Sequence, residues 1–215
     1  YGQVLQIARS YVPGGLGGWL YYKKTPPLAP LDCTIEIDER TAADGTIVCD
    51  LDFDSAKESV KELAAKGVEA VTICLINSFS NDLHERKIRE LVEELLPGIP
   101  TSISSEVIPE MQEYERTITT VANSYVRPQV ENYISNLQLE FKKEMDGATL
   151  SILRSDGGLA TASAARDFPV YMLMSGPAGG VSGAIWVGAQ AGIDNIITFD
   201  MGGTSTDVAL IENGQ

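Results

Sequence analysis

The sequence has little of the residue types that build disulfide frameworks and zinc sites. Three cysteines, Cys33, Cys49 and Cys74, are spread over 215 residues, and His84 is the single histidine. Because the cysteines are odd in number, widely spaced and without a CxxC pair, they argue against both kinds of site. This cysteine usage is typical of a reducing compartment, and we expect a cytoplasmic protein.

Long apolar runs and clusters of basic residues are missing too. A membrane-spanning helix needs roughly 20 apolar residues, whereas the longest candidate stretch, residues 178–191, is shorter and rich in glycine. The 16 basic residues are opposed by 30 acidic ones, for a formal net charge of −14, and they form no basic stripe. We therefore expect neither a membrane nor nucleic acid as a partner.

The residues that are present predict alternating helices and strands. An apolar share of 44% is enough to bury a core. Residues 1–30, rich in Gly and Pro, predict an irregular segment, and residues 33–49 predict a hairpin. Beyond them the apolar periodicity predicts a helix from Asp54 to Gly67 and then a buried parallel strand from Val68 to Ile76. A second helix is expected from a capping pair at Asp82 and Glu85 to Pro97, followed by a strand from Thr101 to Ser105. A long helix should cover Tyr114 to Met145, and Pro128 is expected to kink or divide it. This order predicts an α/β fold class with right-handed crossovers.

We expect three parts along the chain. Residues 1–53 form the irregular and hairpin segment, residues 54–146 form an α/β part with the long helix, and residues 147–215 form a connecting helix and a final hairpin. The boundary between the last two lies near Asp146 and Gly147. The chain opens at Tyr1 without a methionine and stops at Gln215 just past a strand, so we expect an internal piece of a longer protein.

The most informative segment is IITFDMGGTSTDVALI, from Ile196 to Ile211. An apolar strand ends in an aspartate, turns through two glycines, presents three hydroxyls and resumes as a second apolar strand. Bare glycine amides can approach phosphate oxygens, and hydroxyls add further donors. The candidate nucleotide-binding residues are therefore Gly202, Gly203, Thr204, Ser205 and Thr206. Asp200 is a candidate catalytic residue that holds a hydrated Mg²⁺, and Asp207 is a candidate for ordering the hairpin or the attacking water.

A plain tight hairpin, whose hydroxyls only satisfy the turn, is the alternative interpretation of this segment. The longer context favours function, since the segment resembles the second phosphate loop of the actin, sugar kinase and heat-shock chaperone ATPases. Just upstream, Pro177 lies in the first turn of a predicted helix, where Gly176 and Gly179 are further candidate nucleotide contacts. Small residues recur every four positions up to Gly188, which fits either a hinge helix crossed closely by another helix or an ordinary packed helix.

Several stretches together resemble the hydantoinase A/5-oxoprolinase family, which includes related acetone and acetophenone carboxylase subunits. They are GVEAVTICLINSFSNDLHE, SSEVIPEMQEYERTITTVANSYVRP, ILRSDGGL, SGPAGGVSGA and ITFDMGGTSTDVALI. The resemblance covers most of the chain from about residue 35. It implies a partial actin-like ATPase (ribonuclease H-like) fold that spans the end of the first lobe and the start of the second.

The resemblance also implies a function. It is the ATP-dependent opening of cyclic amides of the hydantoin or 5-oxoproline type, with ATP and Mg²⁺ as cofactors and phosphorylation of the substrate as the activating step. Two alternatives stay open: the ATP-using subunit of a ketone carboxylase, and a non-catalytic actin-like scaffold that switches shape with nucleotide. The implied partners are a cyclic amide or ketone substrate and a second hydantoinase B-type subunit or fused domain, and a homo-oligomer is compatible with the sequence.

Three further residues have both a functional and a structural interpretation. His84 matches a histidine of the family motif and could act as a catalytic base, although a solvated histidine at a helix start is commoner. Arg116, in the run Tyr114-Glu115-Arg116, could contact substrate or phosphate, although such charges are usually solvated or paired. Cys74, in a predicted buried strand, is expected to be a small core residue.

We predict that these 215 residues alone do not turn over ATP. The opposing phosphate loop and the adenine pocket of an actin-like ATPase are not recognisable in the sequence, and positioning is most of phosphoryl-transfer catalysis. The strand at Val68–Ile76 should also have an unpaired edge that promotes self-association. Calorimetric titration with Mg-ATP, a turnover assay and light scattering test these expectations, and steady turnover by the purified chain would contradict the first.

Overall fold

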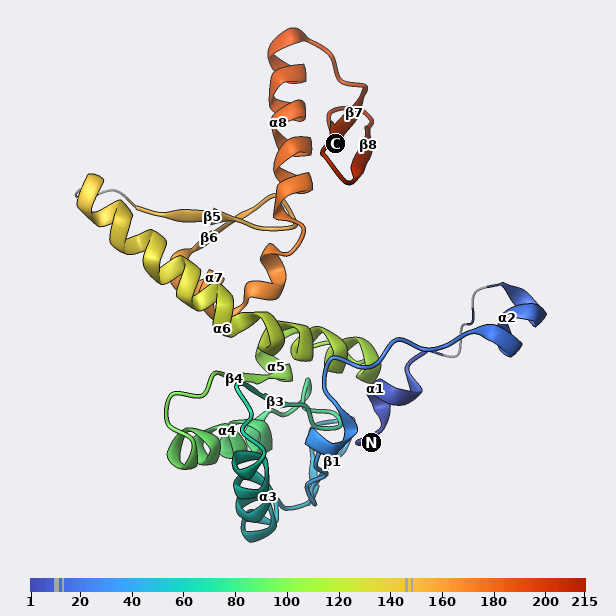
Figure 1. Ribbon diagram of the computed structural model, residues 1–215, viewed down its shortest axis with the longest axis vertical. Helices are drawn as coiled ribbons and strands as arrows, with labels where there is room; N and C mark the ends of the chain where they lie inside the picture. The colour runs from blue at the N-terminus through green and yellow to red at the C-terminus, as the bar shows by residue number, and fades with distance from the viewer. Residues whose placement is uncertain (10–11, 13, 146, 148) are drawn as a thin grey trace. The chain divides into compact units, whose positions relative to one another are not determined.

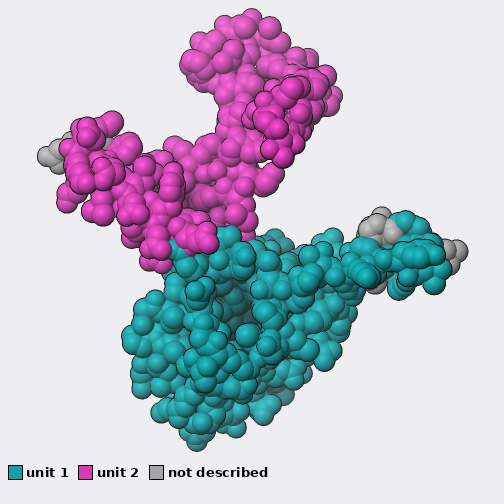
Figure 2. Space-filling model, viewed as in Figure 1, with its two compact units in different colours: residues 1–128 teal, residues 129–215 magenta. Residues whose placement is uncertain are grey.

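The computed structural model describes residues 1–9, 12, 14–145, 147 and 149–215. The chain divides into two compact units, Tyr1–Pro128 and Gln129–Gln215 (Figure 2). The expected boundary at Asp146 falls on a residue outside the described ones, and the three-part division stays a prediction.

The first unit is organised around a short parallel pair of strands (Figure 1). Strand β3 (Val71–Ile73) pairs with β4 (Thr101–Ile103) in parallel, and among the described residues β3 has no other strand beside it. The remaining elements are α1 (Val4–Ile7), α2 (Gly15–Tyr21), η1 (Leu31–Cys33), the antiparallel pair β1 (Arg40–Thr41) and β2 (Ile47–Cys49), α3 (Phe53–Ala65), α4 (Leu83–Leu95), α5 (Ser104–Val107) and the first half of α6 (Glu113–Glu144).

The core of this unit forms because the two amphipathic helices bury their apolar faces against the strands. Asp52 begins α3 by accepting a hydrogen bond from the amide of Ser55 at 3.0 Å, which is a standard N-cap. Burial of apolar side chains is the dominant favourable term in folding. The buried cluster consists of Ala56, Val60, Val71, Ile73, Ile88, Leu91, Val92 and Ile103.

The predicted helices of this unit are confirmed, while the strands and one cap differ. The strand expected from Val68 to Ile76 covers only Val71–Ile73, and the strand expected to reach Ser105 stops at Ile103 because α5 begins there. The expected capping pair at the start of α4 is wrong. Asn81, and not Asp82, accepts a hydrogen bond from the amide of Leu83 at 3.1 Å, and Glu85 turns into the protein interior.

Helix α6 is one continuous helix of 32 residues with Pro128 inside it. Of the two expected effects of this proline, division of the helix is wrong and a kink stays a prediction. Proline removes one helical hydrogen bond, but the turn before it is held by bonds to both strands. Ser124 accepts from the hydroxyl of Thr72 at 2.7 Å, and Arg127 donates to the carbonyl of Thr101 at 2.8 Å.

The second unit contains two antiparallel hairpins and the glycine-rich helix (Figure 1). Its small core is formed by Ile134, Ala162 and Ala165, with Val130, Leu150, Ile152 and Met172 packed on them. Its elements after α6 are β5 (Ser151–Leu153), β6 (Leu159–Thr161), α7 (Ala162–Asp167), η2 (Pro169–Met172), α8 (Ser175–Ala191), β7 (Ile196–Met201) and β8 (Thr206–Ile211). No helix in the described parts of the chain combines the length and the apolar character that crossing a membrane requires.

Small residues on α8 allow strand β7 to lie directly against the helix. A Cβ built on Gly188 would meet Cδ1 of Ile196 at 2.3 Å and the carbonyl oxygen of Ile193 at 2.8 Å, and one built on Gly180 would lie 3.7 Å from Oδ2 of Asp200. Within the described residues, Gly180 and Gly188 of the small-residue stripe thus lie against a strand and not against a second helix, which agrees with the interpretation as an ordinary packed helix.

We predict opposite effects for two alanine substitutions on this helix. Gly188→Ala should lower the free energy of unfolding by about 1–3 kcal/mol, because the new methyl group collides with backbone that has to shift. Gly183→Ala is the matched control, with open space around it, and should raise the free energy by about 0.5–1 kcal/mol through helix propensity. Urea denaturation of both variants measures the difference. Equal effects would contradict the packing described for β7.

Candidate functional site

The segment that the sequence marks as nucleotide-binding is a regular antiparallel hairpin. Strands β7 and β8 pair from Ile196↔Ile211 to Met201↔Thr206, as the sequence predicts. The turn is closed by a hydrogen bond from the amide of Gly202 to the carbonyl of Ser205 at 2.9 Å. A Cβ on Gly203 would meet nothing within 4 Å, so the backbone at the turn is open to approach.

The polar side chains around the turn of this hairpin are exposed and have no partner within the described residues. All residues from Asp200 to Asp207 are exposed. Among the described residues, neither the two aspartates nor the hydroxyls of Thr204, Ser205 and Thr206 take part in a hydrogen bond or an ion pair. A turn whose hydroxyls only satisfied its own backbone would show such bonds, so the plain structural interpretation of these hydroxyls loses its main support.

The two aspartates face each other across the hairpin. Asp200 and Asp207 are direct cross-strand partners, which places their Cβ atoms about 4.5–5.5 Å apart on one face of the hairpin. Like charges in that arrangement repel each other and destabilise the pair. A bound cation removes this repulsion, so the pair fits a hydrated divalent metal ion such as Mg²⁺, whose preferred ligands are carboxylate oxygens and waters.

The opposite face of the same hairpin is apolar and exposed. Ile197, Phe199, Met201, Val208 and Leu210 alternate with the aspartate-bearing face, and each has more than half of its surface exposed. The hairpin is therefore two-sided, with an acidic face toward α8 and an apolar face away from it.

The two candidate glycines at the start of α8 differ in their surroundings. Gly176 is exposed and a Cβ there would meet nothing within 4 Å, whereas a Cβ on Gly179 would lie 2.6 Å from Cδ2 of Leu153. Packing against β5 thus accounts for the glycine at position 179 without any ligand. A role in nucleotide contact stays a prediction for both glycines.

His84 lies in the other unit and is buried, so its interpretation as a solvated helix-start histidine is wrong. Its side chain is 2% exposed, and its Nδ1 lies 2.9 Å from Oε2 of Glu39, which is 5% exposed. Glu39 also accepts from the hydroxyl of Thr41 at 3.3 Å. Nε2 of His84 has no hydrogen-bond partner within the described residues. A carboxylate that orients one imidazole nitrogen and leaves the other free is an arrangement found in catalytic bases, but here the free nitrogen has no contact with solvent.

Two buried charges hold a single residue at the end of β3. Glu85 is fully buried and accepts from the amide of Leu75 at 2.9 Å, from the hydroxyl of Ser104 at 2.6 Å and from the amide of Ser105 at 2.9 Å. Arg116 is also fully buried and donates to the carbonyl of Leu75 at 2.8 Å.

Arg116 has further partners inside the protein. It donates to the carbonyl of Glu110 at 2.7 Å, and its guanidinium lies 5.4 Å from the ring centroid of Phe79. Both terminal nitrogens of Arg116 therefore donate to the protein's own carbonyls, and its buried Nε has no partner within the described residues. Arg116 is not a surface arginine.

A row of three side chains fixes the loop between β3 and α4 to the β1–β2 turn. Asn77, Ser80 and Asn81 donate to the carbonyls of Thr41, Ala43 and Gly45 at 2.8, 3.0 and 2.8 Å. The turn is itself ordered by Asp44, whose carboxylate accepts from the amide of Thr46 at 3.0 Å. That hydrogen bond lowers the pKa of Asp44.

Comparison with known proteins covers nearly the whole chain. Two profiles match, one described as hydantoinase/oxoprolinase N-terminal region over residues 2–96 and one as hydantoinase/oxoprolinase over residues 116–215. The chain belongs to the hydantoinase/oxoprolinase family.

Individual relatives agree with this assignment. The α subunit of caprolactamase from Pseudomonas jessenii is 33% identical over 201 residues, which are 92% of this chain and 29% of the relative. 5-Oxoprolinase 1 from Arabidopsis thaliana is 32% identical over 167 residues, which are 76% of this chain and 13% of the relative. The nucleotide-free structure of acetone carboxylase, an ATP-dependent enzyme, superimposes with a TM-score of 0.85 at 31% identity, over 100% of this chain and 30% of that one.

These likenesses confirm the expected family and fold class. The chain spans less than a third of the length of each of these relatives. Family members include ATP-dependent enzymes and proteins that are named as subunits.

Sequence reasoning missed the buried charges at the start of α4, although a signal was present. His84 lies four positions and Glu85 three positions before Ile88, which is a buried residue on the apolar face of that helix. A charged residue on the apolar face of a predicted helix is expected to be buried and paired. The partner residue Glu39 gave no such signal, because it comes from a distant segment without regular structure.

We predict that Glu85→Ala lowers the free energy of unfolding by about 2–4 kcal/mol. The substitution leaves the part-buried amides of Leu75 and Ser105 without an acceptor, and each orphaned group costs about 1–3 kcal/mol. The Ser104 hydroxyl also loses this acceptor but keeps Oγ of Ser78 at 3.1 Å. Glu90→Ala on the exposed side of the same helix is the control and should change the stability little. Chemical denaturation compares the two variants, and a loss below about 1 kcal/mol for Glu85→Ala would show that the buried carboxylate does not organise this region.

Proposed function

We propose that this chain is part of an ATP-dependent hydrolase subunit that opens cyclic amides, and that the β7–β8 hairpin is one of its phosphate-binding loops. The observation that carries the proposal is the pair of exposed, unpartnered aspartates beside a glycine turn whose backbone is open to approach. Two directly opposed carboxylates do not stabilise a hairpin by themselves, because they repel each other, whereas a metal ion with its phosphate ligand would be held by them.

The donor set fits Mg-ATP. The amide of Gly203 and the hydroxyls of Thr204, Ser205 and Thr206 provide neutral donors for phosphate oxygens, which backbone amides in turns bind well. The amide of Gly202 closes the turn on Ser205, and the missing side chain at position 202 leaves room for a phosphate to approach. Asp200 would hold the metal ion through water, and Asp207 would share its charge or order the attacking nucleophile. When bound, ATP supplies the phosphoryl group that makes the amide carbon of the substrate a good electrophile.

A cyclic amide is the substrate class that most of the named relatives support. Caprolactamase and 5-oxoprolinase both carry cyclic amides in their names, and both are at least 32% identical to this chain. By the same likeness, a second hydantoinase B-type subunit or fused domain is the expected partner, since the caprolactamase relative is an α subunit.

The alternative is the ATP-using subunit of a ketone carboxylase. It is favoured by the TM-score of 0.85 with acetone carboxylase. A non-catalytic nucleotide switch is the remaining possibility, and it differs from both enzymes in showing no substrate-dependent ATP cleavage. Assay of the complete protein with lactams, with ketones plus bicarbonate, and with ATP alone separates the three functions.

We predict that Asp200→Asn in the complete protein lowers the rate of substrate-dependent ATP cleavage by about 100-fold or more, because it removes a carboxylate that organises the metal ion. Asp207→Asn should also lower the rate and raise the Mg²⁺ concentration needed for half-maximal activity. Asp194→Asn is the control, because Asp194 lies just before β7 with an exposed side chain, and it should leave the rate unchanged. Unchanged turnover in Asp200→Asn with an intact fold would refute the proposed role.

A further inference from the structure

Helix α2 and the residues after it form an arm that carries exposed aromatic side chains (Figure 1). We call residues 14–26 the aromatic arm. Trp19, Leu20 and Tyr21 are 68%, 80% and 85% exposed, and each residue from 19 to 26 is exposed. A run of large apolar side chains in water, flanked by polar residues, marks an interaction site on a protein surface. The aromatic arm is therefore a candidate for contact with another surface.

The base of the aromatic arm is fixed beside the start of α6. The ammonium group of Lys24 donates to the carbonyls of Gln6 and Ile7 in α1. Just after α1, Nε of Arg9 donates to Oε1 of Glu115 at 2.7 Å. These contacts hold the base of the arm next to the first turn of α6, while the aromatic side chains further along the arm stay exposed.

The arm and the rest of the chain carry opposite charge. The first 31 residues contain three basic residues and no acidic one, whereas positions 32–215 contain 13 basic and 30 acidic residues, for a formal charge of −17. Of the three basic residues, Arg9 and Lys24 are bound within the chain. Lys23 is exposed and takes part in no hydrogen bond or ion pair in the described parts of the chain. The arm thus complements an acidic surface that has an apolar centre.

A surface of this kind lies next to the base of the arm. Met111 is 69% exposed and stands in sequence between Glu110 and Glu113, at the start of α6. Neither carboxylate has a hydrogen-bond or ion-pair partner within the described residues. We call these three residues the acidic patch. Glu113 is two positions from Glu115, which holds the base of the arm, so arm and patch adjoin each other. Their combined surface is complementary to a second copy of itself, as a twofold-symmetric dimer requires.

The size of the arm also favours a reciprocal contact between two copies. A buried aromatic side chain removes about 150–250 Å² from solvent. The exposed parts of Trp19, Leu20, Tyr21 and Tyr22 would therefore remove roughly 400–500 Å², and the surface beneath them about as much again. One arm stays below the roughly 1,200 Å² that a stable interface buries, whereas two exchanged arms reach about 1,600–2,000 Å², which is the standard size.

We propose that two copies of this protein form a twofold-symmetric dimer by exchanging aromatic arms, each arm lying on the acidic patch of the other copy. Trp19 and Tyr21 supply the apolar contact with Met111, since Trp and Tyr are among the residue types that dominate binding energy at interfaces. Lys23 pairs with the carboxylates of the patch. None of these residues belongs to the β7–β8 hairpin, so the dimer does not depend on the function proposed for that hairpin.

Sedimentation equilibrium of the complete protein, expressed without any second subunit, tests the proposal. The wild type should be a dimer, and Trp19→Ala combined with Tyr21→Ala should raise its dissociation constant by about 100-fold or more, because both arms lose their anchors. Tyr125→Ala combined with Tyr133→Ala is the matched control. It removes two exposed aromatic side chains from α6 and should leave the dissociation constant unchanged. Circular dichroism and urea denaturation show that each variant is folded.

A charge exchange tests the pairing of Lys23 with the acidic patch. Lys23→Glu and Glu110→Lys should each weaken the dimer by about 10-fold or more, because each places like charges opposite each other. The double variant restores opposite charges and should recover most of the wild-type affinity. Lys87→Glu and Glu90→Lys, at exposed positions of α4, are the matched controls and should change nothing.

The other possible occupants of the arm give different results, and each would overturn the proposal. A monomeric wild type whose stability in urea falls on Trp19→Ala would mean that the arm is covered within its own chain. A monomer that uses the arm only to bind a second kind of subunit would make that subunit the occupant. A dimer that keeps its affinity without Trp19 and Tyr21 would pair through a different surface. If the double charge variant stays weak, the arm does not contact the acidic patch.

Discussion

The first unit depends on the hydrogen bonds that two fully buried charged residues make to the backbone of Leu75. Glu85 binds its amide and Arg116 binds its carbonyl, so the first residues after β3 are fixed by α4 on one side and by α6 on the other. Buried charges are stable only when their hydrogen bonds are satisfied, and here neutral backbone groups supply most of them. The same carboxylate also begins α5 through Ser104 and Ser105. One residue of α4 therefore sets the path of both chain segments that leave the parallel strands.

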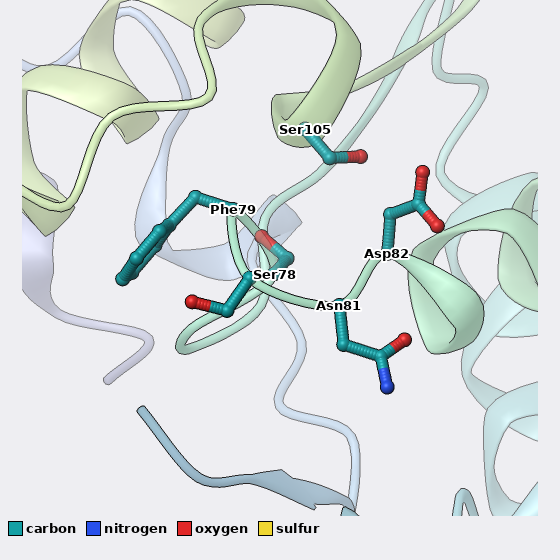
Figure 3. Close-up of a pocket in the computed structure, with 6 residues that line it drawn as sticks. Ser78, Phe79, Asn81, Asp82 and Ser105 are labelled. Carbon is teal, nitrogen blue, oxygen red and sulfur yellow. The ribbon is translucent and has the colours of Figure 1, made fainter. Parts of the chain in front are cut away.

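This arrangement explains why polar residues can line the end of a small sheet without disordering it. The loop after β3 (Figure 3) is fixed at its start by the hydrogen bonds to Leu75 and along its length by hydrogen bonds to the β1–β2 turn. At its end it is fixed by the buried pair of His84 with Glu39. The segments at this end of the unit are thus held together by directional hydrogen bonds. The apolar cluster that packs α3 and α4 on the strands supplies most of the hydrophobic burial. A site built on such a loop is positioned before its ligand binds.

Local signals in the sequence predicted the elements that local physics decides. The period of the apolar residues located α3, α4 and α6, and the run of strand, glycine turn and strand located the β7–β8 hairpin. The buried charges and their partners arise from long-range contacts, for which one sequence holds no distance information. Glu85 shows the limit clearly, because its spacing from Asp82 fits a capping pair, yet tertiary partners outcompete the local bond. Pro128 shows it again, since bonds from Ser124 and Arg127 to the strands maintain a helix that proline alone would weaken.

The turn between β1 and β2 is recognised through its backbone alone. Asn77, Ser80 and Asn81 contact carbonyl oxygens of Thr41, Ala43 and Gly45, and every amino acid carries that oxygen. The exposed side chain at position 43 can therefore change during evolution without loosening the contact. Position 41 is more restricted, because Thr41 is buried and its hydroxyl donates to Glu39. Position 45 is restricted as well, because its φ of +85° favours glycine and a Cβ there would come within 3.2 Å of the carbonyl of Ser80. Mutational tolerance should consequently vary from residue to residue along this turn, although all three contacts are made to its backbone.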